Sequence, residues 1–184
     1  MKLNDIITER KNYMRMGKFL SYLLRHNPSK VDLQLSKSGW ANVDELLSKT
    51  RFTKDDLDII VSTDNKQRFV YNDGETQIRA NQGHSIDVDL GLNEVEPPSI
   101  LYHGTPINNV GAIEKSGIKK MSRYHVHLSV DEDTAHKVGA RRGEHIIMVI
   151  NAKAMYEDGY KFYKSENGVW LTDVVPPKYI KDSV

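Results

Sequence analysis

Hydrophobic residues recur every three or four positions in the first part of the chain, the pattern of an amphipathic helix. The clearest run extends from about residue 9 to Arg25 and stops at Asn27-Pro28, because the residue before a proline avoids helical backbone angles. Arg25 and His26 therefore fall at the C-terminal end of this predicted helix, and both can point toward whatever lies beyond it. A simpler interpretation is that they only balance the negative end of the helix dipole.

Two shorter helices and a hairpin follow. Asn42 and Thr53 are suitable N-caps for the two helices, and Glu45 has capping-box spacing from Asn42. Residues 69–79 predict a hairpin, because Asn72-Asp73-Gly74 can form a short turn between Phe69-Val70-Tyr71 and the segment from Thr76 to Arg79. Three helices and a hairpin are the components of a winged helix, a module that commonly binds nucleic acid.

The second strand of this hairpin runs into a polar stretch that ends at Ser85. The stretch begins at Gln77, places Ile78 beside Arg79, and continues with amides, a glycine, a histidine and a hydroxyl. Polar side chains of this kind at the end of a strand suit an anion. A hairpin strand that runs into an ordinary polar surface loop explains the same composition.

A change in the hydrophobic pattern after Ser85 predicts a domain boundary. Hydrophobic periodicity fades through Gly91 and Pro97-Pro98. We expect residues 1–90 to form one domain and residues 91–184 the other.

Short strands alternate with short helices in the second half. The predicted elements are strands at Ile100–Tyr102, Val126–Leu128 and Ile146–Ile150, a helix over Asn109–Ser116, a helix from Asp131, and a hairpin around Asn167-Gly168. Ser129 and Glu132 have capping-box spacing at the start of the second of these helices. The apolar run Ile146–Ile150 has the character of a buried central strand.

Composition narrows the class of protein. The 184 residues are 39% hydrophobic and 28% charged, which is ordinary for a globular protein. No apolar run is long enough to span a bilayer and no signal-peptide core is present, so we expect a cytoplasmic protein without membrane contact. The absence of cysteine excludes disulfides and thiolate metal sites.

A net charge of +1 argues against a protein that coats nucleic acid by bulk attraction. Any contact with nucleic acid should therefore be local. One local excess exists between residues 10 and 25, where no acidic residue interrupts Arg10, Lys11, Arg15, Lys18 and Arg25. A solvated helix face explains the same charges.

Histidines in the second half offer candidate chemistry. His125 and His127 alternate on a predicted strand, which is the geometry of a metal pair, but no HExxH-type spacing supplies a third ligand, and we expect no metal. His103-Gly104-Thr105 follows a strand directly. Glycine lets a ligand approach the backbone, and the imidazole and hydroxyl can bond to ribose or a carboxamide. The chain contains neither GxGxxG nor GxxxxGK[ST].

Basic residues suited to phosphate are spread over both halves. They are Arg25, His26, Arg79 and one of Arg141 or Arg142. Guanidinium groups match phosphate oxygens two at a time and remain charged. Converging arginines would repel one another unless a dianion lay among them, whereas each of them alone is typical of a protein surface.

Read together, these segments resemble the RNA 2′-phosphotransferase family, NAD-dependent enzymes that remove the 2′-phosphate left at a splice junction in tRNA. The resemblance covers nearly the whole chain in the family's order. The matching segments are Lys18 to His26, Gly39-Trp40, Ile78 to Ser85, Leu101 to Thr105, His125 to Ser129, Val138 to Arg141, and Gly168 to Thr172 with Val175-Pro176-Pro177. Few of these motifs are specific alone, but their joint order is.

The resemblance implies an α+β protein, with an N-terminal winged-helix lobe that binds RNA and a C-terminal mixed α/β lobe that is similar to ADP-ribosyltransferases and holds NAD. It implies that the catalytic residues are Arg25, His26, Arg79 and Arg141, where Arg141 is preferred to Arg142 for its spacing from Val138-Gly139. It implies an NAD site formed by His103, Gly104, Thr105, His127, Ser129 and Val169. We expect a monomer.

The chemistry implied by the resemblance has two steps. The RNA 2′-phosphate attacks C1″ of the nicotinamide ribose and expels nicotinamide, which leaves RNA joined through phosphate to ADP-ribose. The ribose O2″ then attacks the phosphorus and releases 2′-OH RNA and ADP-ribose 1″,2″-cyclic phosphate. Many ADP-ribosyltransferases place a glutamate near this hydroxyl, where the present chain has Val169. Two alternatives are an ADP-ribosyltransferase without the second step, acting on nucleic-acid or protein acceptors, and a winged-helix regulator.

Overall fold

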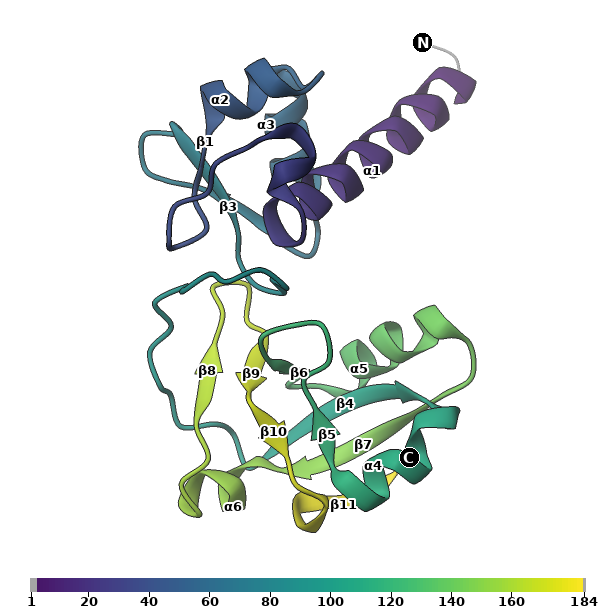
Figure 1. Ribbon diagram of the computed structural model, residues 1–184. Coiled ribbons are helices and arrows are strands. Elements are labelled where there is room, and N and C mark those ends of the chain that lie inside the picture. The colour runs from purple at the N-terminus through teal and green to yellow at the C-terminus, as the bar shows by residue number, and fades with distance from the viewer. Residues whose placement is uncertain (1–2, 184) are drawn as a thin grey trace. The chain divides into compact units, whose positions relative to one another are not determined.

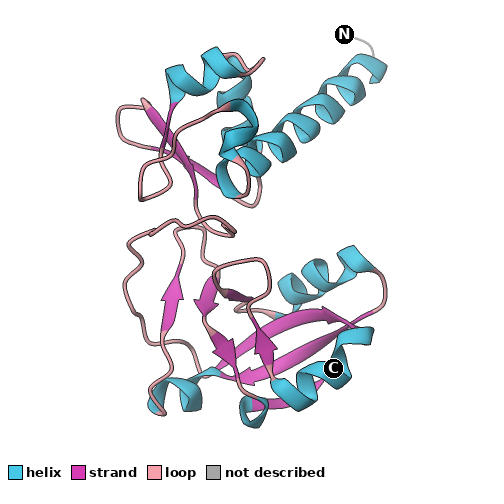
Figure 2. Cartoon of the chain, in the orientation of Figure 1, coloured by secondary structure: helices cyan, strands magenta, loops and turns pink. Residues whose placement is uncertain are grey.

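The chain forms a mixed α/β protein of two compact units, Met1–Gly91 and Leu92–Val184 (Figure 1). The structure, a computed structural model, describes residues 3–183, and the side chains of residues 3–11, 142, 182 and 183 lie outside this description. Six α-helices and several small sheets occur in the described part (Figure 2). No helix within residues 3–183 is both long and apolar enough to cross a membrane.

The first unit contains the predicted helices and hairpin. Its elements are α1 (Leu3–Arg25), a 3₁₀ turn (Pro28–Val31), β1 (Ala41–Asn42), α2 (Val43–Lys49), α3 (Lys54–Thr63), β2 (Phe69–Tyr71) and β3 (Gln77–Ala80). The strands form one antiparallel sheet in the order β1-β3-β2. Helix α1 begins earlier than predicted, and residues 3–8 contain no glycine or proline that would stop it.

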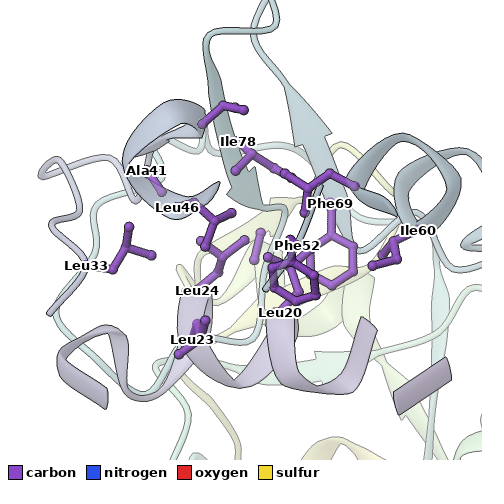
Figure 3. Packing of buried hydrophobic residues seen from close by; sticks show 13 residues of the cluster. Leu20, Leu23, Leu24, Leu33, Ala41, Leu46, Phe52, Ile60, Phe69 and Ile78 are labelled. Carbon is purple, nitrogen blue, oxygen red and sulfur yellow. The ribbon is translucent and has the colours of Figure 1, made fainter. Parts of the chain in front are cut away.

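One face of α1 builds the core of this unit. Leu20, Leu23 and Leu24 are fully buried, and Figure 3 shows Leu24 near Leu46 and Leu20 near Phe52. Burial of each leucine contributes roughly 1.5–3 kcal/mol. The end of α1 is therefore held in place by packing immediately before Arg25.

The two short helices are capped by side chains. Asn42 Oδ1 accepts from the Glu45 amide at 2.9 Å, as predicted, but the Glu45 carboxylate pairs with Lys49 at 2.8 Å. Thr53 and Asp56 form a complete capping box at the start of α3. Both helices thus begin where the sequence indicated.

The second unit carries three small sheets. Its elements are β4 (Ile100–Pro106), a 3₁₀ turn (Ile107–Asn109), α4 (Val110–Ser116), β5 (Ile118–Lys119), β6 (Val126–Leu128), α5 (Glu132–Gly139), a 3₁₀ turn (Ala140–Arg142), β7 (His145–Asn151), α6 (Ala152–Glu157), β8 (Phe162–Lys164), β9 (Trp170–Thr172), β10 (Val174–Val175), a 3₁₀ turn (Pro177–Tyr179) and β11 (Ile180–Ser183). The strand orders are β11-β7-β4, β6-β9-β8 and β10-β5. The predicted hairpin around Asn167-Gly168 is confirmed as β8 and β9.

Strand β4 is longer than its sequence indicated. It pairs with β7 along its whole length, from Ile100 opposite Asn151 to Pro106 opposite His145. His103-Gly104-Thr105 was expected directly after a strand, and that expectation is wrong, because these residues lie within β4. Pairing with the buried β7 extends the strand through a glycine that alone would disfavour it.

The predicted capping box of Ser129 and Glu132 is also wrong. The amide and carbonyl of Ser129 are both bonded to Tyr102, at 2.8 and 2.9 Å, so Ser129 extends a strand and joins β4 to the end of β6. Asp131 caps α5 instead, and its carboxylate accepts from the Thr134 amide at 2.7 Å.

We predict that Gly117→Ala destabilises the second unit. Gly117 ends α4 with φ +75°, and a Cβ there would overlap the carbonyl oxygen of Val175. We expect the free energy of unfolding to fall by roughly 2–4 kcal/mol, measured by urea denaturation. The matched control is Gly111→Ala on the same helix. A Cβ at Gly111 meets nothing within 4 Å, so this variant should be neutral or up to about 1 kcal/mol more stable. Equal stability of the two variants would contradict the prediction.

Candidate functional site

The polar stretch after β3 docks on the C-terminal end of α1. The Ser85 amide donates to the Arg25 carbonyl at 2.9 Å, and Ser85 Oγ lies 2.9 Å from Nδ1 of His26. Asn81 and His84 are buried. The interpretation of this stretch as an ordinary surface loop is therefore wrong for its buried residues. The loop brings β3 and the end of α1 together.

Arg79 is directed away from the core by the alternation of β3. Ile78 and Ala80 are buried on one face of the strand, so Arg79 projects from the other. Its guanidinium carbon lies 4.5 Å from the ring centroid of Trp40, which is a cation–π distance. Trp40 is itself held by a bond from the Ser36 amide to its carbonyl at 2.8 Å.

Arg25 is buried, with 6% of its surface exposed. The loop lies against its guanidinium, since a Cβ at Gly83 would be 3.7 Å from Cζ. An arginine in the last turn of a helix is favoured by the helix dipole, and buried arginines in proteins usually bind an anion or a carboxylate.

The same loop carries His84, whose ring is close enough to Arg25, His26 and Arg79 to be affected by their charges. Burial lowers the pKa of His84 to about 4, and the positive charges of Arg25, His26 and Arg79 act in the same direction. Its Nε2 has no hydrogen-bond partner among the described residues and faces Gly39. We call Arg25, His26, Arg79 and His84 the cationic cluster. His84 was not predicted as a site residue, although its place inside the Gln77–Ser85 stretch was a signal.

The second unit contains a separate group of partly buried imidazoles. His103 Nδ1 donates to the His127 carbonyl at 2.9 Å, and His127 Nδ1 lies 3.0 Å from the His125 carbonyl. Burial lowers the pKa of His103, opposed only by the bond to the carbonyl. His103 is therefore neutral at pH 7, with Nδ1 protonated and Nε2 as a hydrogen-bond acceptor.

The other predicted NAD residues differ in their position relative to His103 and His127. Thr105 is buried on the same face of β4 as His103, and Ser129 joins β4 to β6. Leu128 of β6 is opposite Trp170 of β9, and continuing this pairing by one residue places Val169 opposite Ser129. Gly104 lies on the opposite face, where a Cβ would overlap the Ala135 carbonyl oxygen. Close packing of α5 therefore explains this glycine.

Arg141 is exposed in the 3₁₀ turn after α5. The side chain of Arg142, its alternative, lies outside the described part. The ring of His125 packs against Tyr163 at a centroid distance of 5.7 Å. Within the described residues, no three histidine, aspartate or glutamate side chains are grouped so that they could hold a metal ion.

The buried neutral ring of His84 predicts loss of stability in acid. Unfolding raises the pKa of His84 from about 4 to its ordinary 6.5, so the unfolded chain binds a proton that the folded chain excludes. Stability is lost as the pH falls from about 6.5 toward 4, by on the order of 2 kcal/mol at pH 5.

Urea denaturation at pH 7.5 and pH 5 measures this effect. In His84→Gln the loss between the two pH values should shrink by the same amount, because glutamine does not titrate. The control His136→Gln, at an exposed ring, should keep the loss of the unsubstituted protein. An unchanged acid dependence in His84→Gln would contradict the prediction.

Comparison with known proteins gives a consistent result over nearly the whole chain. The model of the RNA 2′-phosphotransferase, Tpt1/KptA family, matches residues 11–174. A probable RNA 2′-phosphotransferase of Flavobacterium johnsoniae is 54% identical over 171 residues, covering 90% of this chain and 94% of that protein. Proteins with the same name from Fusobacterium nucleatum and Trichormus variabilis are 51% and 49% identical, and the matches cover 92% and 94% of this chain and 98% and 97% of those proteins. The chain belongs to the RNA 2′-phosphotransferase, Tpt1/KptA family.

Proposed function

We propose that this protein removes an internal 2′-phosphate from RNA and transfers it to ADP-ribose, with NAD as co-substrate. The products are 2′-OH RNA, nicotinamide and ADP-ribose 1″,2″-cyclic phosphate. Membership of the family supports the RNA 2′-phosphotransferase activity. The proposed substrate is RNA with a 2′-phosphate of the kind left by tRNA splicing.

The loop that ends at Ser85 carries this proposal, because it follows Arg79 of β3 and bonds to both Arg25 and His26. Three groups that are or can be cationic act together on one buried ring. A phosphate dianion matches two guanidinium groups, so a site that contains both Arg25 and Arg79 suits a phosphorylated substrate. We propose these three residues as catalytic, together with Arg141 from the second unit.

The first step requires positioning more than proton transfer. The RNA 2′-phosphate is already an anion, so it attacks C1″ of the nicotinamide ribose without a base, and nicotinamide leaves. The arginines hold the phosphate oxygens, which fixes the direction of attack. Arg79 is well suited to this role because stacking on Trp40 limits the motion of its guanidinium.

The second step breaks the bond between phosphorus and the RNA O2′. The ribose O2″ attacks the phosphorus, and the departing O2′ needs a proton. We assign this proton to His26, whose ring is oriented by Ser85 through Nδ1. The arginines stabilise charge on the phosphoryl oxygens as the bonds exchange.

We propose that the partly buried imidazoles of the second unit bind NAD. His103 presents Nε2 as an acceptor, which suits a ribose hydroxyl, and Thr105 and Ser129 add polar groups to the same region. We propose His103, Gly104, Thr105, His127, Ser129 and Val169 as the NAD site, to which Gly104 would contribute only backbone atoms because α5 covers its other face. Val169 is apolar and would leave the O2″ hydroxyl able to act in the second step.

We further propose that the first unit is a winged-helix RNA-binding lobe and that the second is an NAD-binding lobe similar to ADP-ribosyltransferases. Three helices with a small antiparallel sheet support the former. Small sheets joined by short helices support the latter. We propose a cytoplasmic monomer.

The decisive experiment is incubation with NAD and a short RNA that carries one internal 2′-phosphate. Mass analysis should find 2′-OH RNA and ADP-ribose 1″,2″-cyclic phosphate in equal amounts. An RNA that keeps its phosphate joined to ADP-ribose would instead identify an ADP-ribosyltransferase that lacks the second step. Release of inorganic phosphate without NAD would overturn the proposal.

Substitution of Arg79 tests the cationic cluster. We expect Arg79→Ala to lower kcat/KM by about 100-fold or more while the melting temperature changes little, because the side chain projects from the core. The kcat/KM of Arg79→Lys should lie between those of Arg79→Ala and the unsubstituted protein, because lysine keeps the charge but lacks the planar guanidinium group. The control Arg51→Ala, at an exposed arginine of the same unit, should leave turnover unchanged. Full activity of Arg79→Ala would remove Arg79 from the mechanism.

A further inference from the structure

A groove on the first unit runs along α1 and ends at His26. Its volume is about 970 Å³, within the range of about 300 to 1,000 Å³ that ligand sites have. One wall is the α1 segment from Tyr13 to Tyr22, and the other is the end of α3 with the segment that leads to Phe69. We call it the α1–α3 groove. It lies entirely within Met1–Gly91.

Two tyrosines of α1 offer aromatic surface in the groove. Tyr22 is 40% exposed, and its hydroxyl accepts from Asn27 Nδ2 at 2.8 Å, which holds the ring in one orientation. The Tyr22 ring lies 6.5 Å from the ring of His26. Tyr13 is half-buried further along the same wall. A platform of this kind, continuous with a catalytic side chain, suits an unpaired nucleobase.

The polar groups at the rim favour an anionic ligand. Lys18 is exposed on the α1 wall, and Arg68 stands on the opposite wall. Arg68 pairs with Asp64, but the Asp64 side chain is 7% exposed and the Arg68 side chain 34%. The positively charged residue of this ion pair is therefore the more exposed of the two.

The opposite wall is anchored to the loop of the cationic cluster. Asn81 donates from its side chain to the Gln67 carbonyl at 2.7 Å and from its amide to the Arg68 carbonyl at 2.8 Å. Asn81 is buried, so these bonds are protected from water. The groove is thus held in a fixed relation to the cationic cluster.

We propose that the α1–α3 groove binds one or two nucleotides of single-stranded RNA next to the 2′-phosphorylated nucleotide. Bases lie against Tyr13 and Tyr22, and backbone phosphates lie near Lys18 and Arg68. This inference rests on the proposed function, because it assigns part of the same substrate. A protein segment would use the apolar floor equally well, but the outward cations and the continuity with His26 favour RNA.

Fluorescence anisotropy with a labelled single-stranded RNA decamer that lacks a 2′-phosphate tests the groove independently of turnover. We expect Lys18→Glu to raise Kd about tenfold and to reduce the salt dependence of binding. Arg51→Glu makes the same change of charge at an exposed site outside the groove and should leave Kd within about twofold. Equal effects of the two variants, or none, would overturn the inference.

Substitution of Tyr13 tests stacking. We expect Tyr13→Ala to raise Kd for the decamer at least fivefold, and Tyr13→Phe to bind as the unsubstituted protein does, because phenylalanine keeps the ring. Thermal melting identifies any loss of folding in Tyr13→Ala, and in that case Lys18→Glu decides the question. A groove occupied by a second copy of the chain would give a dimer in sedimentation that Lys18→Glu dissociates, with RNA affinity unchanged, and this result would overturn the inference.

The two proposals can fail separately. If the protein binds the decamer through the groove but yields no cyclic phosphate from NAD and phosphorylated RNA, the groove assignment stands and the proposed function falls. If turnover is normal while Lys18→Glu and Tyr13→Ala bind the decamer as well as the unsubstituted protein does, the groove assignment alone falls.

Discussion

The last carbonyl groups of a helix need donors from outside the helix, and in α1 the amide of Ser85 supplies one to Arg25. This contact joins segments that are far apart in the sequence, as does the neighbouring hydrogen bond between His26 and Ser85, which are 59 residues apart. It joins a helix anchored by buried leucines to a strand whose outward side chain is Arg79. The arrangement of the cationic cluster depends on this closure.

A neutral histidine near a group of cations avoids additional repulsion between like charges. A third permanent charge beside Arg25 and Arg79 would add repulsion, whereas the uncharged His84 ring adds polar atoms without a charge. The second unit uses the same device at His103, where a backbone carbonyl fixes the tautomer. Both candidate sites therefore rely on imidazoles that burial keeps unprotonated at neutral pH.

Local signals in the sequence predicted much of the fold. Apolar spacing located α1, N-cap residues located α2 and α3, and turn residues located both hairpins. The failures share a cause, which is competition from distant residues. Ser129 has the side chain of a cap, but its backbone is committed to Tyr102, and that pairing depends on residues far away in the chain.

The sequence indicated candidate residues for the site, and the structure adds their positions within each unit. Chemistry and family resemblance indicated Arg25, His26 and Arg79, and the structure brings these three together. His84 was missed because a histidine in a polar loop gives no sign of burial until the loop docks. The packing reason for Gly104 was hidden as well, since it depends on the path of α5 over β4.

The two hydrogen bonds from Asn81 to the carbonyl groups of Gln67 and Arg68 limit how the length of this part of the chain can vary. An insertion or deletion between Thr63 and Phe69 would pull on the same residue that starts the Ser85 loop. Length variation in the first unit is instead expected at the exposed turn around Asp73-Gly74, where added residues would extend into solvent.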